Sequence, residues 1–195
     1  GIKGDWNRNN ISIKNLTFTG QSEAAIWLMG AGCENNIIEN CKFYNIFRTA
    51  ILFMGRNNLI SNCSFQDIFG RGIFGYDVSS SQISGSRFKR IGLQPGYGES
   101  GVGDLQAVVL NVGNANLVTE NEIDSVGYSG INCSVENSTI EKNIITHTLL
   151  TTGDGGAFYC YGESMKNSTI SNNFIDAVIG NITARPSDSH LIVNG

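Results

Sequence analysis

Proline is nearly absent from this 195-residue sequence, which contains only Pro95 and Pro186. A proline removes a hydrogen bond from a β-ladder, so its scarcity is compatible with closely stacked strands. Long apolar runs are also absent. No apolar stretch reaches the roughly 18 residues that a membrane-spanning helix needs, so no membrane span is expected. The sequence begins at Gly1 rather than at methionine, and no signal peptide is visible.

Charge is scarce as well. Charged residues make up 15% of the chain, the net charge is −4, and lysine and arginine form no cluster. A nucleic-acid partner is therefore not expected, because phosphate binding needs a basic patch. The five cysteines include no Cys-x-x-Cys pair, which argues against zinc, and their odd number argues against a disulfide framework. No metal site and no cofactor are predicted.

A six-residue pattern with a polar third position recurs along the chain. Its clearest copies, Ile-Glu-Asn-Cys-Lys-Phe and Ile-Ser-Asn-Cys-Ser-Phe, begin at Ile38 and Ile60. The third positions of the copies are Asn15, Asn40, Asn62, Gly85, Glu120, Lys142 and Asn172. Most steps are about 22 to 25 residues, enough for three short strands and three turns, which is one coil of a solenoid. Two longer steps indicate insertions near residues 91–106 and 147–155.

Within each copy the apolar residues alternate with polar ones, as in half-buried strands. Asparagine suits the turn, because it tolerates the left-handed conformation and its amide can bond to the backbone or to the neighbouring coil. In the pair Asn172-Asn173 either residue could be the stacked one. Cys41 and Cys63 follow the turn position in adjacent coils, so we expect both inside and stacked. A disulfide between them remains open.

These repeats resemble the right-handed parallel β-helix of the pectin-lyase-like superfamily over essentially the whole chain. The resemblance implies an all-β, single-stranded right-handed parallel β-helix, a solenoid of about seven coils, with residues 1–195 as one domain. No end cap is recognisable, and we expect a fragment of a longer protein that lacks one or both caps. The resemblance also implies a secreted protein, extracellular or periplasmic.

A second family of strands is predicted to carry the working face. Alternation from the glycines that end these strands predicts one apolar core column, Ile26, Ile51, Ile73, Val109, Ile131 and Phe158. The opposite, outward positions would then be Trp27, Leu52, Phe74, Leu110, Asn132 and Tyr159, followed by Met29, Met54, Tyr76, Val112, Ser134 and Tyr161. An outward surface with so many aromatic residues is unusual.

Three interpretations of this surface stay open. The aromatic residues could stack on sugar rings, which predicts a substrate-binding role for Trp27, Phe74, Tyr76, Tyr159 and Tyr161, with Asn132 beside them. Alternatively, a segment outside this sequence covers the surface. In a third interpretation the register is off by one residue in some coils, which would turn these side chains inward.

The second insertion contains an acid among glycines, Gly153-Asp154-Gly155-Gly156, followed by Ala157-Phe158-Tyr159. Glycines let the backbone turn tightly and approach a ligand. The pattern resembles one in β-helix glycoside hydrolases, including a β-xylosidase family and relatives that act on plant polysaccharides. In those enzymes the aspartate belongs to the catalytic carboxylate pair, so the resemblance implies a catalytic role for Asp154. A turn aspartate that caps a backbone amide is the alternative.

Glycoside hydrolysis usually needs two carboxyl groups. Counted from the ends of the strands, Asp188 is predicted on the same edge as Asp154, one coil away, which suits a retaining pair. Asp104 is predicted on that edge two coils away, nearer to an inverting geometry. Glu99, in the glycine-rich first insertion, could fold over the groove. The glutamate that the resembling families carry one coil later has no clear match in this sequence.

Four further side chains are candidates for substrate binding. His147 and His190 could bond to substrate or help in proton transfer, although a structural role is the more usual one. Arg48 and Arg71 precede adjacent strands and could bind a uronate or act as the base of a lyase; solvated edge positions are the simpler interpretation. A lyase would often use Ca²⁺, but no cluster of aspartates for it is apparent. The motifs of polygalacturonases are absent.

The sequence therefore predicts a carbohydrate-active protein whose partner is a polysaccharide or oligosaccharide. A glycoside hydrolase is favoured, because two long insertions are predicted on one edge beside the aromatic residues. A polysaccharide lyase, and a non-catalytic carbohydrate-binding, adhesin or tailspike-like β-helix, remain as alternatives.

Overall fold

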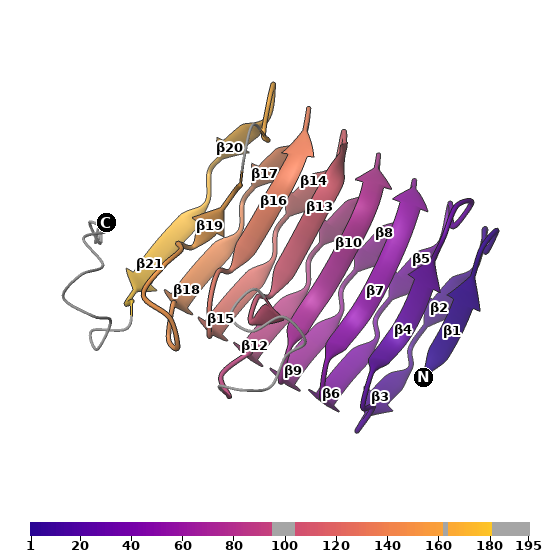
Figure 1. Cartoon of the computed structure of the whole chain (residues 1–195), viewed down its shortest axis with the longest axis horizontal. Coiled ribbons are helices and arrows are strands. Elements are labelled where there is room, and N and C mark those ends of the chain that lie inside the picture. The colour runs from indigo at the N-terminus through magenta and orange to yellow at the C-terminus, as the bar shows by residue number, and fades with distance from the viewer. Residues whose placement is uncertain (95–103, 162–163, 181–195) are drawn as a thin grey trace.

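Every regular element of the described chain is a β-strand. The computed structural model describes residues 1–94, 104–161 and 164–180, in which 21 strands form three parallel sheets of seven strands each. One strand from each sheet makes a coil, and seven coils stack along one axis from the N-terminus to the C-terminus (Figure 1). The predicted all-β parallel solenoid of about seven coils is confirmed.

The three sheets are named here in the order in which the first coil enters them. Sheet A contains β1 (Ile2–Asp5), β4 (Ala24–Met29), β7 (Thr49–Arg56), β10 (Arg71–Ser79), β13 (Val108–Asn114), β16 (Ile131–Glu136) and β19 (Phe158–Tyr159). Sheet B contains β2 (Ser12–Lys14), β5 (Ile37–Glu39), β8 (Leu59–Ser61), β11 (Gln82–Ser84), β14 (Leu117–Thr119), β17 (Thr139–Glu141) and β20 (Thr169–Ser171). Sheet C contains β3 (Thr17–Thr19), β6 (Lys42–Ile46), β9 (Ser64–Ile68), β12 (Arg87–Ile91), β15 (Glu122–Val126), β18 (Ile144–Thr148) and β21 (Phe174–Val178).

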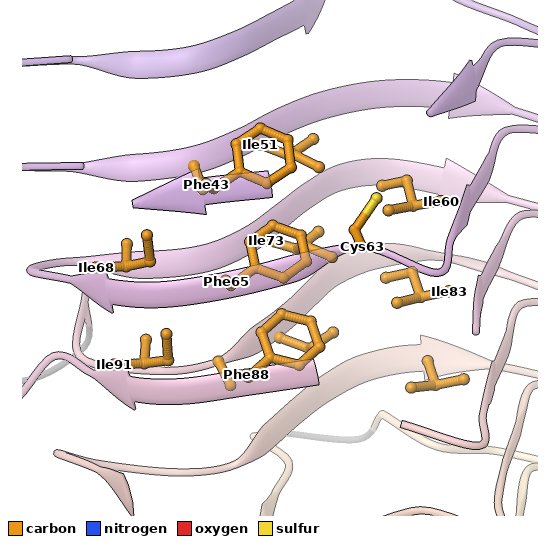
Figure 2. Close-up of a cluster of buried hydrophobic side chains, with 14 of the residues drawn as sticks. Phe43, Ile51, Ile60, Cys63, Phe65, Ile68, Ile73, Ile83, Phe88 and Ile91 are labelled. Carbon is orange, nitrogen blue, oxygen red and sulfur yellow. The ribbon is translucent and has the colours of Figure 1, made fainter. Parts of the chain in front are cut away.

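The core consists of columns of like side chains, one from each coil. Phe43, Phe65 and Phe88 stack face to face on sheet C, with ring centroids 4.8 and 4.5 Å apart and nearly parallel planes (Figure 2). Ile51 and Ile73 from sheet A pack beside them. The phenylalanine column continues in register with isoleucine in the last three coils, so side chains of the same type stack at the strand spacing of about 4.8 Å.

The asparagines have two separate structural roles. The third positions of the repeat adopt left-handed backbone conformations where sheet B turns into sheet C, as with Asn40 at φ 54°. From the second coil onward the next residue points inward, so Asn173, not Asn172, is the stacked one. There, Asn121 Nδ2 donates to Asn143 Oδ1 at 3.0 Å, and Asn143 Nδ2 donates to Asn173 Oδ1 at 2.9 Å. This buried ladder satisfies polar groups that would otherwise be unpaired inside the coil.

Cys41 and Cys63 lie in the same inward column, buried as predicted, and both are free thiols. The Cys63 Sγ donates to backbone carbonyls, one of them that of Ser61 at 3.3 Å. Burial raises the pKa of Cys63 to about 12, so its thiol is neutral at ordinary pH.

The structure corrects the predicted register of β13. Val108, not Val109, aligns with Ile73 and Ile131, so Leu110 points inward with 1% of its surface exposed and Asn111 points outward. The prediction counted back from Gly113. Near their ends, β10 and β13 each contain a bulge with one extra residue relative to the preceding or following strand. A position counted back from the strand end is therefore wrong by one residue. Val112, at φ 64°, lies at this irregularity and is exposed.

Both long insertions leave the coil at the turn from sheet C into sheet A. The first separates β12 from β13 and the second separates β18 from β19. Their placement on one edge is therefore as predicted, and this edge is called the C–A corner below. No helix in the described part of the chain has the length and apolar character to cross a membrane.

Candidate functional site

The outer surface of sheet A carries two rows of side chains that run along the axis. In register, the first row contains Trp27, Leu52, Phe74, Val109, Asn132 and Tyr159, and the second contains Met29, Met54, Tyr76, Asn111 and Ser134. Trp27, Phe74, Tyr76 and Tyr159 face outward as predicted, and Tyr161 follows the end of β19, where it is 76% exposed.

The two ends of this surface differ in chemistry. Strands β4 and β7 present Trp27, Leu52 and two methionines, which have little capacity for hydrogen bonding. Strand β13 presents Asn111, and strand β16, one coil further along the axis, presents Asn132 and Ser134. A sugar offers both apolar ring faces and hydroxyl groups, so the part of sheet A from β13 to β19 suits it better.

Trp27 lies at the other end of the sheet, far along the axis from Asp154. Its Nε1 donates to Asp5 Oδ1 at 2.8 Å, and the Lys3 ammonium lies 4.9 Å from the ring centroid. These contacts hold the indole against the first coil. The structure therefore does not bring Trp27 together with the residues of the C–A corner.

A buried ion pair occupies the C–A corner at the start of β10. Arg71 pairs with Asp104, which belongs to the described end of the first insertion, and Asp104 is only 2% exposed. The Arg71 guanidinium also lies over the Phe74 ring, 4.4 Å from its centroid, and 16% of the arginine side chain is exposed. Burial lowers the pKa of Arg71, and the charge of Asp104 opposes this shift. Arg71 is thus fixed at the edge of the outer face and is not a freely solvated edge residue.

The loop that contains Asp154 packs on the preceding coil through a tyrosine. Gly155 has φ 132°, and a Cβ added to it would lie 2.4 Å from Cε2 of Tyr128. The Tyr128 ring is tilted against the Tyr159 ring, with centroids 5.7 Å apart. Burial raises the pKa of the Tyr128 hydroxyl, and the neighbouring Tyr159 and Asp154 act in the same direction. Asp154 itself is exposed and close enough to Tyr128 to affect its pKa.

The structure places the remaining predicted residues as follows. Arg48 lies at the C–A corner two coils before the Asp104 turn and pairs with Glu23 at 2.5 Å. His147 lies on sheet C, where its Nδ1 is 2.8 Å from Asp124 Oδ1, so it is not on the sheet A face. The predictions for Glu99, Asp188 and His190 fall outside the described residues.

Tyr128 and Asn111 are the residues of this region that the sequence prediction missed. Tyr128 stands between Gly127 and Gly130 where β15 turns towards β16, the same kind of glycine-flanked corner that drew attention to Asp154. Asn111 was hidden by the error in register. Among the described residues, no group of three or more histidine, cysteine, aspartate and glutamate side chains is arranged to hold a metal ion.

Residues 6–103 match the family model described as the right-handed beta helix region. The chain belongs to the right-handed β-helix family. Among solved structures, it is similar to the enzymatically active domain of tailspike protein 2 from bacteriophage CBA120, with a TM-score of 0.56 and 10% sequence identity. The similarity covers 85% of this chain but 22% of that one, and at this identity it shows a shared fold. No curated protein matches the sequence.

Proposed function

We propose that this β-helix protein is carbohydrate-active outside the cell and hydrolyses glycosidic bonds of a polysaccharide or oligosaccharide bound on sheet A. The observation that carries the proposal is the position of Asp154. Its carboxylate is exposed at the C–A corner, on a loop packed against Tyr128 and Tyr159, next to the polar part of the sheet A face. An aromatic platform with a carboxylate beside it suits a sugar ring and its glycosidic oxygen.

The outer face of sheet A supplies the binding contacts. Tyr159 and Tyr161 offer ring faces, while Asn111 on β13 and Asn132 and Ser134 on β16 offer hydrogen bonds from two adjacent coils, about 4.8 Å apart. This spacing is close to the length of one sugar unit, so two adjacent units can meet Asn111 and Ser134, which lie in register.

Asp104 is better suited to positioning than to catalysis. It is buried and its charge is paired with Arg71, so it fixes the guanidinium over Phe74 at the edge of the face. Arg71 can then donate hydrogen bonds to substrate hydroxyls. The second catalytic carboxyl is assigned to Asp188 or Glu99, in keeping with the sequence prediction.

In this assignment Asp154 exchanges a proton with the glycosidic oxygen while the anomeric carbon–oxygen bond breaks. The second carboxyl either attacks the anomeric carbon or takes a proton from the attacking water. Carboxyls about 5 Å apart retain the anomeric configuration, whereas carboxyls roughly 6.5–9.5 Å apart invert it. Retention would therefore favour Asp188, predicted one coil from Asp154.

One observation favours a polysaccharide lyase as a second candidate. Burial lowers the pKa of Arg71 beside the sheet A face, and an arginine must lose its proton to act as a base. In this mechanism Arg71 removes the proton next to a uronate carboxylate, and the leaving group departs to give an unsaturated product. Asp104 opposes it, because a paired carboxylate holds the proton on the guanidinium.

The nature of the product separates these functions. The full chain is incubated with xylan, polygalacturonate and fucosylated oligosaccharides, and the products are followed by NMR. The proposal expects new saturated reducing ends of one anomeric configuration. Unsaturated ends from polygalacturonate would establish the lyase instead, and binding without any product would establish a non-catalytic carbohydrate-binding protein.

A further inference from the structure

One coil lacks a side chain at the corner where sheet B turns into sheet C. Gly85 occupies this position with φ 59°, whereas the six other coils have asparagine, glutamate or lysine there in the same left-handed conformation. The missing side chain leaves a notch between the neighbouring coils. A Cβ at Gly85 would lie 2.7 Å from Asn62 Oδ1, so the Asn62 amide leans into the notch.

The notch opens into a cavity of about 420 Å³ whose lining is polar. Its walls include Asn62, Ser64, Gly85, Arg87, Glu120 and Glu122. This volume is within the usual range for small-molecule sites, about 300–1,000 Å³. No aromatic side chain contributes to the lining, so a ligand here would be held by hydrogen bonds and not by stacking.

Arg87 and Glu122 form one wall and retain hydrogen-bonding capacity. The Arg87 Nε and Nη2 both point to Glu122 Oε2, at 2.8 and 2.7 Å. This pairing leaves Nη1 and Oε1 outside the ion pair, as a donor and an acceptor on adjacent coils. Across the notch from Asn62 stands Glu120, the left-handed corner residue of the next coil. The Gly85 N–H donates to the carbonyl of Thr119, the residue before Glu120, and this bond joins the two coils at the notch.

We propose that this cavity is a second saccharide-binding site, for a sugar unit that carries vicinal hydroxyls and no carboxylate. A pair of adjacent hydroxyls can donate to Glu122 Oε1 and accept from Arg87 Nη1, and Asn62 and Glu120 can take the remaining groups. Two carboxylates face one guanidinium, so the lining has a net charge of −1 and repels a uronate.

This site is separate from the proposed hydrolytic site. The turn between sheets B and C is the corner of the coil that does not border sheet A, so a sugar bound there does not contact Asp154. The choice of a saccharide among hydroxyl-bearing ligands rests on the proposed function. A second site of this kind would hold the protein on a polymer while another segment is cleaved.

The test uses the full chain with Asp154→Asn, in which turnover is expected to be strongly reduced, and follows amide and arginine Nε–H signals by NMR. Xylotetraose, chitotetraose and tetragalacturonate serve as probes. With a neutral or acetamido sugar, signals of Gly85, Ser86 and Arg87 are expected to shift in a saturable manner. Gly85→Asn fills the notch with the residue found in four other coils. It is expected to lower the affinity measured from these shifts at least about tenfold.

Lys142→Asn is the matched control, because it lies at the same corner with φ 56° but outside the cavity. It should leave the affinity unchanged, and the thermal unfolding of both variants reports whether they fold. Unchanged affinity in a folded Gly85→Asn variant, tighter binding of tetragalacturonate, or no shift with any of the three probes would each overturn the proposal. Because Asp154 is already replaced, none of these outcomes depends on the hydrolytic activity.

Discussion

Gly155 lies directly against the ring of Tyr128, and the Asp154 loop is positioned by this contact. The glycine is needed twice: its φ of 132° strains any other residue, and a Cβ would lie 2.4 Å from Tyr128 Cε2. The ring itself is buried and tilted against Tyr159 on the next strand. A small change at Gly155 is therefore transmitted to the carboxylate beside it.

Gly155→Ala should destabilise the loop and lower activity. The strained backbone and the overlap with Tyr128 together should lower the unfolding free energy by about 2–4 kcal/mol, unless the loop moves away from Tyr128 to relieve them. Gly20→Ala is the control, since Gly20 also has a positive φ, 72°, but nothing within 4 Å of an added Cβ. The unfolding free energy of both variants is measured by chemical denaturation, and their activity by turnover. Equal losses of stability and activity in the two variants would show that the Tyr128 contact has no role.

Asp104→Asn should leave Arg71 charged and unpaired in a buried position. Breaking a buried ion pair from one side typically costs about 3–5 kcal/mol. If Asp104 positions Arg71 for substrate binding, the folded variant should also show a raised KM with a smaller change in kcat. The exposed ion pair of Arg87 and Glu122 serves as the comparison. Glu122→Gln should lower the unfolding free energy by less than about 1 kcal/mol. A collapse of kcat at unchanged KM would instead assign Asp104 to catalysis.

Asn143→Ala should interrupt the buried asparagine ladder. Asn143 Nδ2 donates to the Val118 and Glu141 carbonyls, and its Oδ1 accepts from Asn121, so several buried groups would lose their partners. We expect a loss of at least about 3 kcal/mol in unfolding free energy. Asn40→Gly, at an exposed left-handed corner that glycine tolerates, should change it by less than about 0.5 kcal/mol. Similar losses in urea unfolding would contradict the two roles of the asparagines.

The stability of the coils should fall in acid partly through Asp67. The Arg90 Nε and Nη2 donate to its carboxylate at 2.6 and 2.7 Å, and this lowers the pKa of Asp67 below its ordinary value of 3.8. A lowered folded-state pKa means stability that is present above about pH 4 and is lost as the pH falls through the folded value. Asp67→Asn should therefore flatten the decline in unfolding midpoint between about pH 5 and pH 2. An unchanged decline would contradict the pairing with Arg90.

The sequence allowed the coil number, the corners and the inward columns to be predicted, because each depends on a local repeat. Phe43 and Phe65 occupy the same place in successive units, and stacking in register follows from that recurrence. The register of β13 could not be derived this way, since the irregularity before Gly113 depends on how β10 and β13 pair. The residues of the C–A corner were partly visible: glycines marked Asp154, but nothing local indicated that Asp104 would pair with Arg71 beneath the surface.

The most direct test of the central proposal is the rate of reducing-end release by the Asp154→Asn variant on the best substrate of the panel. Asp77→Asn is the control, because Asp77 is an exposed aspartate at the far end of β10 and has a left-handed backbone that asparagine accepts. If Asp154 exchanges the proton with the glycosidic oxygen, kcat/KM should fall about 10²- to 10⁴-fold in Asp154→Asn and stay near wild type in Asp77→Asn. Undiminished release by a folded Asp154→Asn variant would contradict the assignment.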